Sequence, residues 1–251
     1  MNGWKWKLVF YAFLLLVWEG ICLLHIWPPY LFPSPGQVWE ALAGGIADHT
    51  ILIAAAVSLK RIVVGYSISL IAGGLIGILI GGNKLLDETL GSLISGLQTL
   101  PSICWLPLAV LWFGISETSI LFVVVMGAFL AIAIATDAGI KNIPPLYVRA
   151  ALTMGTGRWD TVVRVILPAA LPSVVTGMKL GWSFAWRALM AGELLFVSMG
   201  LGHLLQMGRD LNDMAQVVAV MIVIVLIGLS ADKLIFSRLE ATVQERWGLW
   251  K

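Results

Sequence analysis

The chain has 251 residues, of which 59% are hydrophobic and only 12% are charged. Soluble domains average about 25% charged residues, so this composition excludes an ordinary soluble globular protein and indicates a surface that faces lipid. The net charge of +2 gives no reason to expect a nucleic-acid partner, and the two distant cysteines, Cys22 and Cys104, exclude a disulfide framework or a paired-cysteine metal site.

A helix that crosses a bilayer needs about 20 mostly apolar residues. Six stretches meet this requirement: 8–27, 62–82, 90–112, 119–136, 173–197 and 215–231. The first ends in Trp27-Pro28-Pro29-Tyr30 rather than in a small-residue cleavage site, which favours an uncleaved span over a signal peptide. The third is interrupted by Pro101 and Pro107. The sequence therefore predicts an all-α membrane protein with about six transmembrane helices in a single domain, residues 1–251.

Two shorter features accompany the first spans. After the turn at Phe32-Pro33-Ser34-Pro35-Gly36, residues 37–42 predict a short helix that lies in the membrane interface. In the second span, Gly73, Gly77 and Gly81 repeat at intervals of four, a pattern that lets two helix backbones approach closely. This stripe serves either packing within the chain or contact with another subunit.

The cations indicate how the spans are oriented. With six spans and a cytoplasmic N-terminus, most of the 16 lysines and arginines lie on the cytoplasmic side, as the positive-inside rule requires. Both termini are then cytoplasmic, and so is the polar segment between the fourth and fifth spans. Lys60 and Arg61 fall on the other side, where we expect them to extend toward lipid head groups.

That polar segment, residues 141–172, is the most informative part of the chain. Residues 146–154 have a helical pattern, Gly155-Thr156-Gly157 interrupts it, and a second amphipathic helix follows from Trp159 to Ile166. We expect Pro168 and Pro172 to end this second helix. Two short helices joined at a glycine turn make a compact knob that can dock into a groove of another protein.

The residues of this segment resemble the EAA signature of permease subunits of binding-protein-dependent ABC importers, which reads Glu-Ala-Ala, three residues, Gly, nine residues, Ile, any residue, Leu-Pro. The matching positions, for which the resemblance implies contact with an ATPase, are Arg149, Ala150, Ala151, Gly155, Val165, Leu167 and Pro168. Val165 replaces the isoleucine, and Arg149 replaces the acidic residue. Residues 31–35, 100–114 and 167–173 also resemble the nitrate/sulfonate/taurine/bicarbonate branch.

The resemblance implies a type I importer fold whose coupling loop is about 141–172, in a bacterial inner membrane. Two permease subunits, expected to be identical, form the path for a small anionic solute, and each docks one cytoplasmic ABC ATPase, so that the complex contains two ATPase copies. An extracytoplasmic solute-binding protein delivers the solute. The chain lacks the GxxxxGK[ST] cradle, so we expect no cofactor here and no enzyme activity, while the ATPase uses ATP-Mg.

Ionisable residues inside spans are costly and mark function. We expect Arg187 to contact the solute, with Ser183 four residues earlier on the same helix face and with Glu193 and Trp105 as further residues of the path. Two alternatives remain: Arg187 forms an internal salt bridge with a carboxylate, and Trp105 serves only bundle packing.

The competing function is an ion-coupled secondary transporter of a small organic or inorganic anion. Such a protein needs carboxylates within its spans, for which the sequence offers Glu19 and Glu193.

Overall fold

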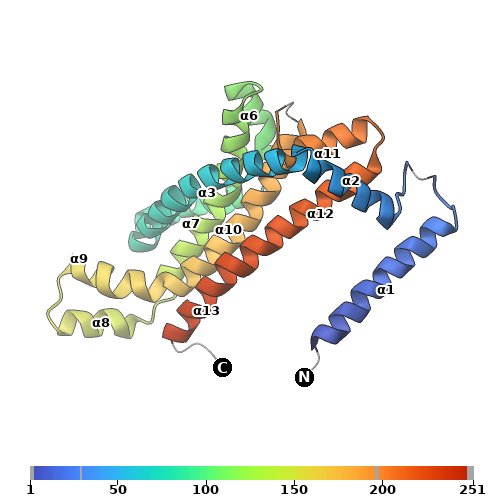
Figure 1. The fold of residues 1–251 in the computed structure, drawn as a ribbon. Coiled ribbons are helices and arrows are strands. Elements are labelled where there is room, and N and C mark those ends of the chain that lie inside the picture. The colour runs from blue at the N-terminus through green and yellow to red at the C-terminus, as the bar shows by residue number, and fades with distance from the viewer. Residues whose placement is uncertain (1–2, 29, 196–197, 248–251) are drawn as a thin grey trace. The chain divides into compact units, whose positions relative to one another are not determined.

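The computed structural model describes residues 3–28, 30–195 and 198–247, and within these ranges it contains helices and no strands (Figure 1). The end of the expected span 173–197 and the tail beyond residue 247 lie outside the described residues. Five helices are long and apolar enough to cross a membrane, or six if one bent pair counts as a single span. This agrees with the predicted all-α membrane class, in which helices satisfy their own backbone hydrogen bonds in lipid.

The chain divides into two compact units. One comprises Met1–Ser58 and Glu193–Leu226, and the other comprises Leu59–Gly192 and Ile227–Lys251. The boundaries fall inside long helices, so each unit combines an early and a late part of the sequence. The single domain expected over residues 1–251 stays a prediction.

The first unit begins with α1 (Gly3–Leu23) and α2 (Pro35–Ala47). The Trp18 indole donates a hydrogen bond of 3.0 Å to the carbonyl of Pro33, between these two helices. Ser34 and Gln37 form a reciprocal capping box at the start of α2, and Pro35 occupies its first turn. These local signals explain why the predicted short helix after the Pro33–Gly36 turn forms. The unit also contains α11 (Leu201–Asp210) and the first part of α12 (Met214–Ala231).

The glycine stripe of α3 (Thr50–Gly82) packs against α7 (Glu117–Lys141) within the second unit. A methyl group added at Gly73 would lie 2.7 Å from the carbonyl oxygen of Phe129, and one added at Gly77 would lie 2.6 Å from that of Ala133. Because glycine has no side chain, the backbones of α3 and α7 can approach closely at these positions. The glycine stripe therefore serves packing within the chain.

The expected third span is not one straight helix. It consists of α4 (Lys84–Leu86), η1 (Asp87–Gly91) and α5 (Ser92–Gln98), followed by η2 (Ser102–Trp105) and α6 (Leu106–Phe113). The two parts, Lys84–Gln98 and Ser102–Phe113, are bent by 104°. Pro101 has an extended backbone (φ −55°, ψ 139°) and cannot continue α5. Pro107 lies in the first turn of α6, where proline is tolerated and breaks nothing.

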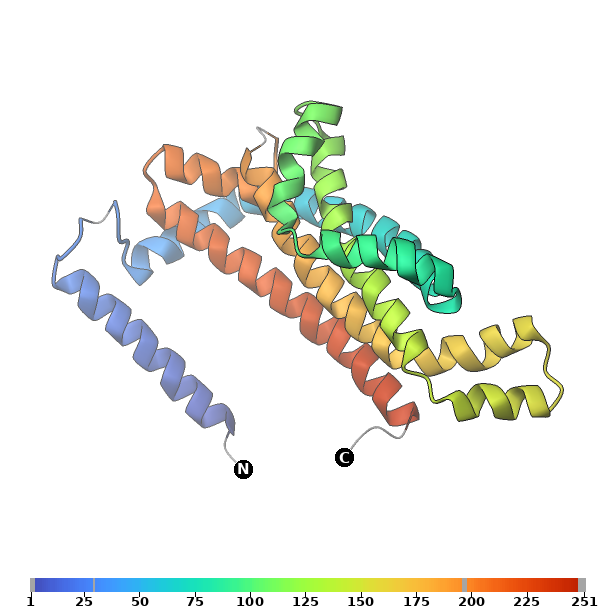
Figure 2. The same cartoon turned by 180° about the vertical axis from the view of Figure 1, so that it is seen from behind.

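After α7 the chain forms a helical hairpin, residues 142–166, which we call the polar hairpin. It contains α8 (Pro145–Thr153), α9 (Arg158–Thr161) and the π-helical segment η3 (Val162–Ile166), and it leads into α10 (Leu167–Leu195). In both views α8 and α9 run side by side and project from the ends of α7 and α10 (Figures 1 and 2).

The expectation that Pro168 and Pro172 end the second hairpin helix is wrong. Helix continues from Arg158 to Leu195 through both prolines. The π segment Val162–Ile166 shifts the backbone hydrogen bonds just before Pro168, so the missing proline N–H falls where the regular pattern is already interrupted. Pro168 then occupies the first turn of α10, and only Pro172 lies inside that helix.

Aromatic side chains from three helices meet in the second unit. The Tyr66 ring of α3 lies edge-on to Trp182 of α10 with centroids 5.3 Å apart, and Trp182 lies 5.7 Å from Phe236. Phe236 ends η4 (Asp232–Phe236), which joins α12 to α13 (Ser237–Arg246). The Tyr66 hydroxyl donates to the carbonyl of Met178 at 2.8 Å. This cluster holds α3, α10 and η4 together.

Candidate transport path and docking hairpin

Several local interactions define the turn of the polar hairpin. Gly155 has a φ of +81°, a left-handed conformation that glycine adopts without a side-chain clash. The Thr156 N–H donates to the carbonyl of Ala151 at 3.2 Å, and the Thr156 and Thr161 hydroxyls lie 2.9 Å apart. The predicted glycine turn is therefore present, and Ala151 is buried beneath it with 2% exposure.

The outer surface of the polar hairpin is apolar and cationic. Leu146, Met154 and Trp159 are 70%, 77% and 78% exposed. Arg149 is also exposed, in the position where the signature has an acidic residue. Of the other signature residues, Ala150 is exposed, whereas Val165, Leu167 and Pro168 are half-buried. Large apolar side chains around a charged group, on a projecting rigid element, are suited to insertion into a groove of another protein.

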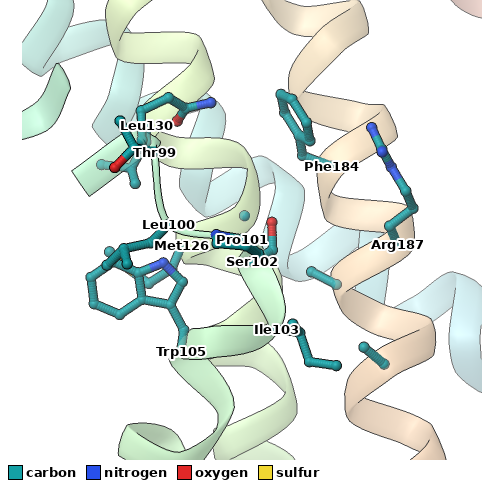
Figure 3. A pocket seen from close by; sticks show the side chains of 14 residues that line it. Thr99, Leu100, Pro101, Ser102, Ile103, Trp105, Met126, Leu130, Phe184 and Arg187 are labelled. Atoms are coloured by element: carbon teal, nitrogen blue, oxygen red, sulfur yellow. The ribbon is translucent and has the colours of Figure 1, made fainter. Parts of the chain in front are cut away.

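A cavity of about 330 Å³ lies between α10 and the bend of the α5–α6 pair. Arg187 and Phe184 come from α10, opposite the segment that carries Thr99 to Trp105, and Met126 and Leu130 of α7 complete the wall (Figure 3). The lining is mostly apolar, with Gln98, Thr99 and Ser102 as its neutral polar groups. Arg187 is the one charged side chain among the residues that line it.

Two contacts hold the Arg187 side chain in place. Its Nε donates a hydrogen bond of 3.1 Å to the carbonyl of Ser183, one helical turn earlier. Its Cζ lies 4.9 Å from the centroid of the Phe184 ring, a cation–π distance. In the described structure no carboxylate forms an ion pair with Arg187, so the guanidinium's remaining donors are available to an anion.

The structure brings two of the four predicted path residues together. Arg187 and Trp105 line the same cavity. Ser183 contributes its backbone carbonyl to Arg187, while its hydroxyl donates to the carbonyl of Lys179 at 3.3 Å. The sequence analysis missed Gln98, Thr99 and Ser102, although their position on either side of Pro101 is a signal that could have indicated them.

Glu193 belongs to a different set of contacts, within the first unit. Its carboxylate is fully buried and accepts hydrogen bonds from the Ser58 hydroxyl, at 2.7 and 2.9 Å, and from the Gly202 N–H at 3.0 Å. Ser58 Oγ in turn accepts from the Leu201 N–H at 2.9 Å. Glu193 and Ser58 thus accept hydrogen bonds from the first two N–H groups of α11, at a helix start where negative charge is stabilised.

The expectation that Lys60 and Arg61 both extend toward lipid head groups is wrong for Arg61. Lys60 is exposed, but Arg61 is only 4% exposed and its Nη2 lies 2.8 Å from Glu117 Oε1, at the start of α7. A long-range carboxylate partner, 56 residues away, draws the guanidinium inward. Helix periodicity alone does not reveal such a pairing.

These features together define a membrane-embedded transport subunit: long apolar helices, a projecting hairpin suited to docking, and a cavity lined by one charged side chain, Arg187. The chain belongs to the family of binding-protein-dependent transport system inner membrane components, whose family model matches residues 73–239. It is therefore the permease subunit of an ABC importer, a transport subunit and not an enzyme. Importers of this family work with an ATPase and a solute-binding protein.

Relatives support this assignment. The chain is 35% identical to the taurine transport system permease protein of Escherichia coli over 78% of this chain and 73% of that protein. It is 32% identical to the nitrate import permease protein of Leptolyngbya laminosa over 76% of this chain and 69% of that protein. The chain thus falls among the nitrate, sulfonate and taurine permeases, as its motifs indicated. The alternative, an ion-coupled secondary transporter, does not fit this family.

The fold also matches a solved importer. The inward-facing methionine ABC transporter MetNI contains a chain that aligns with a TM-score of 0.61 at 20% identity, over 75% of this chain and 96% of that chain. This likeness confirms the predicted type I importer permease fold.

Proposed function

We propose that the chain forms the translocation path for a small anionic solute of the sulfonate, taurine, nitrate or bicarbonate class. The observation that carries the proposal is Arg187, the single charged group on a mostly apolar cavity, with Phe184 stacked against it. A guanidinium presents several N–H donors in one plane and binds oxyanions with more than one hydrogen bond. Arg187 is exposed to the cavity in the single chain, so a solute can reach its N–H donors.

The polar groups that accompany Arg187 suit the same kind of solute. Thr99 and Ser102 carry hydroxyls and Gln98 an amide, all able to donate to oxyanion oxygens. The names of the taurine and nitrate permeases that resemble the chain support an anion of this type.

The polar hairpin is the proposed contact with the ATPase, on the cytoplasmic side. Support comes from its exposed Leu146, Met154 and Trp159 and from its signature residues. The same orientation makes both termini cytoplasmic and assigns to that side the majority of the lysines and arginines. The ATPase consumes ATP-Mg, and this chain binds no cofactor of its own.

The proposed assembly contains two identical copies of the chain, two ATPase copies and one extracytoplasmic solute-binding protein. The apolar surface of helix α1 is available for contacts outside the chain, because no residue of its apolar segment Trp4–Leu23 is buried by the rest of the described structure. Lipid or the second copy covers such a surface.

The test is uptake by the reconstituted complex in proteoliposomes, with the ATPase and the cognate binding protein. Taurine, nitrate and bicarbonate are offered in turn, after the binding protein has been screened against the same solutes by thermal shift. We expect vanadate-sensitive uptake of one of these oxyanion-bearing solutes, lost in Arg187→Leu and partly retained in Arg187→Lys. Arg238→Leu, an exposed arginine of α13, is the matched control. Unchanged uptake by Arg187→Leu would refute the role of Arg187.

A further inference from the structure

Two lysines each join a helix adjacent to the polar hairpin to a neighbouring segment. Lys141 is the last residue of α7, and its Nζ lies 2.5 Å from Asp87 Oδ1 and 2.7 Å from Asp137 Oδ2. Lys179 lies on α10, and its Nζ is 3.3 Å from Asp232 Oδ1 and 3.5 Å from Glu240 Oε2. We call these sets the Lys141 cluster and the Lys179 cluster. Each side of the hairpin thus has one lysine bound to two carboxylates.

Both clusters attach to π-helical turns. Asp87 is the first residue of η1 (Asp87–Gly91), and Asp232 is the first residue of η4 (Asp232–Phe236). A π turn is wider than an α turn, is rare, and occurs frequently at functional sites. In both clusters, therefore, the lysine reaches across to the beginning of an irregular turn in another helix.

The Lys141 cluster is partly shielded from solvent. The side chains of Lys141, Asp87 and Asp137 are 39%, 38% and 18% exposed. Asp137 Oδ1 is buried without a hydrogen-bond partner, so Lys141 is the group that compensates the Asp137 charge. By contrast, Lys84 and Glu88 lie 3.8 Å apart with 90% and 64% exposure, an ordinary surface pair that contributes little.

The two clusters connect the hairpin to both walls of the cavity. Asp87 begins η1, which runs directly into α5, and α5 ends at Gln98 on the cavity wall. The opposite wall is α10, which carries both Lys179 and Arg187. The hairpin is thus linked to one wall through the Lys141 cluster and to the other through α10, which the Lys179 cluster joins to η4 and α13.

We propose that Lys141 and Lys179 are positioning residues that transmit motion of the polar hairpin to the helices around the cavity; the proposal rests on the function proposed above. Helices held only by apolar contacts can slide past one another, because such contacts have no preferred direction. An ion pair with two carboxylates fixes distance and direction, so the helices move together. Without the lysine, the ATPase still hydrolyses ATP, but the helices around Arg187 no longer move with the hairpin.

Gly91 gives an independent way to disturb the Lys141 cluster. A methyl group added at Gly91 would lie 2.9 Å from Asp87 Oδ1. The methyl group would also lie 3.2 Å from Ile80 Cγ2, so the Ile80 side chain must shift slightly as well. The nearest atoms all belong to side chains, and the closest is the end of a flexible one, so Gly91→Ala displaces the Asp87 carboxylate from Lys141. The variant leaves every charge in place and tests the contact itself.

The experiment measures solute uptake and ATP hydrolysis together, in proteoliposomes that contain the full complex and its binding protein. The variants are Lys141→Met, Lys179→Met, Gly91→Ala, and the conservative Lys141→Arg and Lys179→Arg. We expect the solute transported per ATP hydrolysed to fall about fivefold or more in the first three and to recover in the arginine variants. Lys84→Met, which removes the surface pair, is the control and keeps the wild-type ratio.

The ratio separates coupling from simple loss of structure. A variant that only assembles less well loses uptake and hydrolysis in equal proportion, and its ratio stays unchanged, which overturns the proposal for that lysine. If the complex with Lys141→Met does not assemble, the ratio measured for Gly91→Ala tests whether the Lys141 cluster is needed for coupling. If the wild-type complex itself shows no ATP-driven uptake, the proposed function fails; if it does and the variants keep its ratio, only the present inference fails.

Discussion

The contact between α3 and α7 predicts a large difference between two neighbouring glycines of one helix. In Gly77→Ala the new methyl group would lie 2.6 Å from the carbonyl oxygen of Ala133 and 2.6 Å from Thr136 Cβ. In Gly74→Ala it would meet no atom within 4 Å. Both changes gain the same helix propensity of about 1 kcal/mol, so this term cancels when the two variants are compared.

The remaining difference is steric. Carbon atoms pack best about 3.5–4.0 Å apart, so α7 must move away from α3 by about 1 Å along the stripe. The obstructing atoms are a backbone oxygen and a Cβ, which no side-chain rotation can remove. Overpacking of this kind costs about 1–3 kcal/mol, and we expect Gly77→Ala to fall at the upper end, about 2–3 kcal/mol less stable than Gly74→Ala.

The assay is unfolding of the purified chain in mixed detergent micelles, with increasing denaturing detergent and helicity measured by circular dichroism. Gly74→Ala should unfold at or above the wild-type midpoint and Gly77→Ala clearly below it. Equal midpoints for the two variants would show that the α3–α7 packing described here is wrong.

Two further predictions concern the buried serine and the hairpin turn. Ser58→Ala removes a donor from the buried Glu193 carboxylate and should lower stability by about 1–3 kcal/mol in the same unfolding assay, whereas Ser67→Ala at an exposed position should not; equal effects would contradict the assigned hydrogen bonds. Gly155→Ala places a side chain at φ +81°, which costs about 1–2 kcal/mol and distorts the turn. Gly155→Ala should therefore reduce copurification of the ATPase, while Gly157→Ala, with φ −66°, should leave it unchanged. Full copurification with Gly155→Ala would show that the turn does not contribute to ATPase binding.

Features that depend on neighbouring residues were predictable from the sequence. The spans other than the bent third one follow from apolar length, and the turn of the polar hairpin follows from Gly155-Thr156-Gly157 between two amphipathic patterns. The helix after the Pro33–Gly36 turn follows from its capping residues. In each case the signal and the structure lie within a few residues of each other.

Features that depend on distant residues were not predictable in the same way. The inward orientation of Arg61 requires Glu117, and the cavity requires the bend at Pro101 to face Arg187. The helix continues through Pro168 because a π segment precedes it, and residue preferences do not indicate a π segment. The lysine clusters likewise join residues 54 and 61 positions apart.

The unbroken helix from Arg158 to Leu195 means that binding at the hairpin and binding in the cavity can influence each other in both directions. Trp159, exposed on the polar hairpin, and Arg187, at the cavity, are 28 residues apart on one helix, a length of about 40 Å. Thermodynamic linkage is reciprocal. If an anion in the cavity and a protein bound at the hairpin favour the same position of this helix, each raises the affinity for the other by the same factor. If the polar hairpin binds the ATPase as proposed, occupancy of the cavity changes the affinity of the hairpin for the ATPase, and ATPase binding changes the affinity of the cavity for its anion.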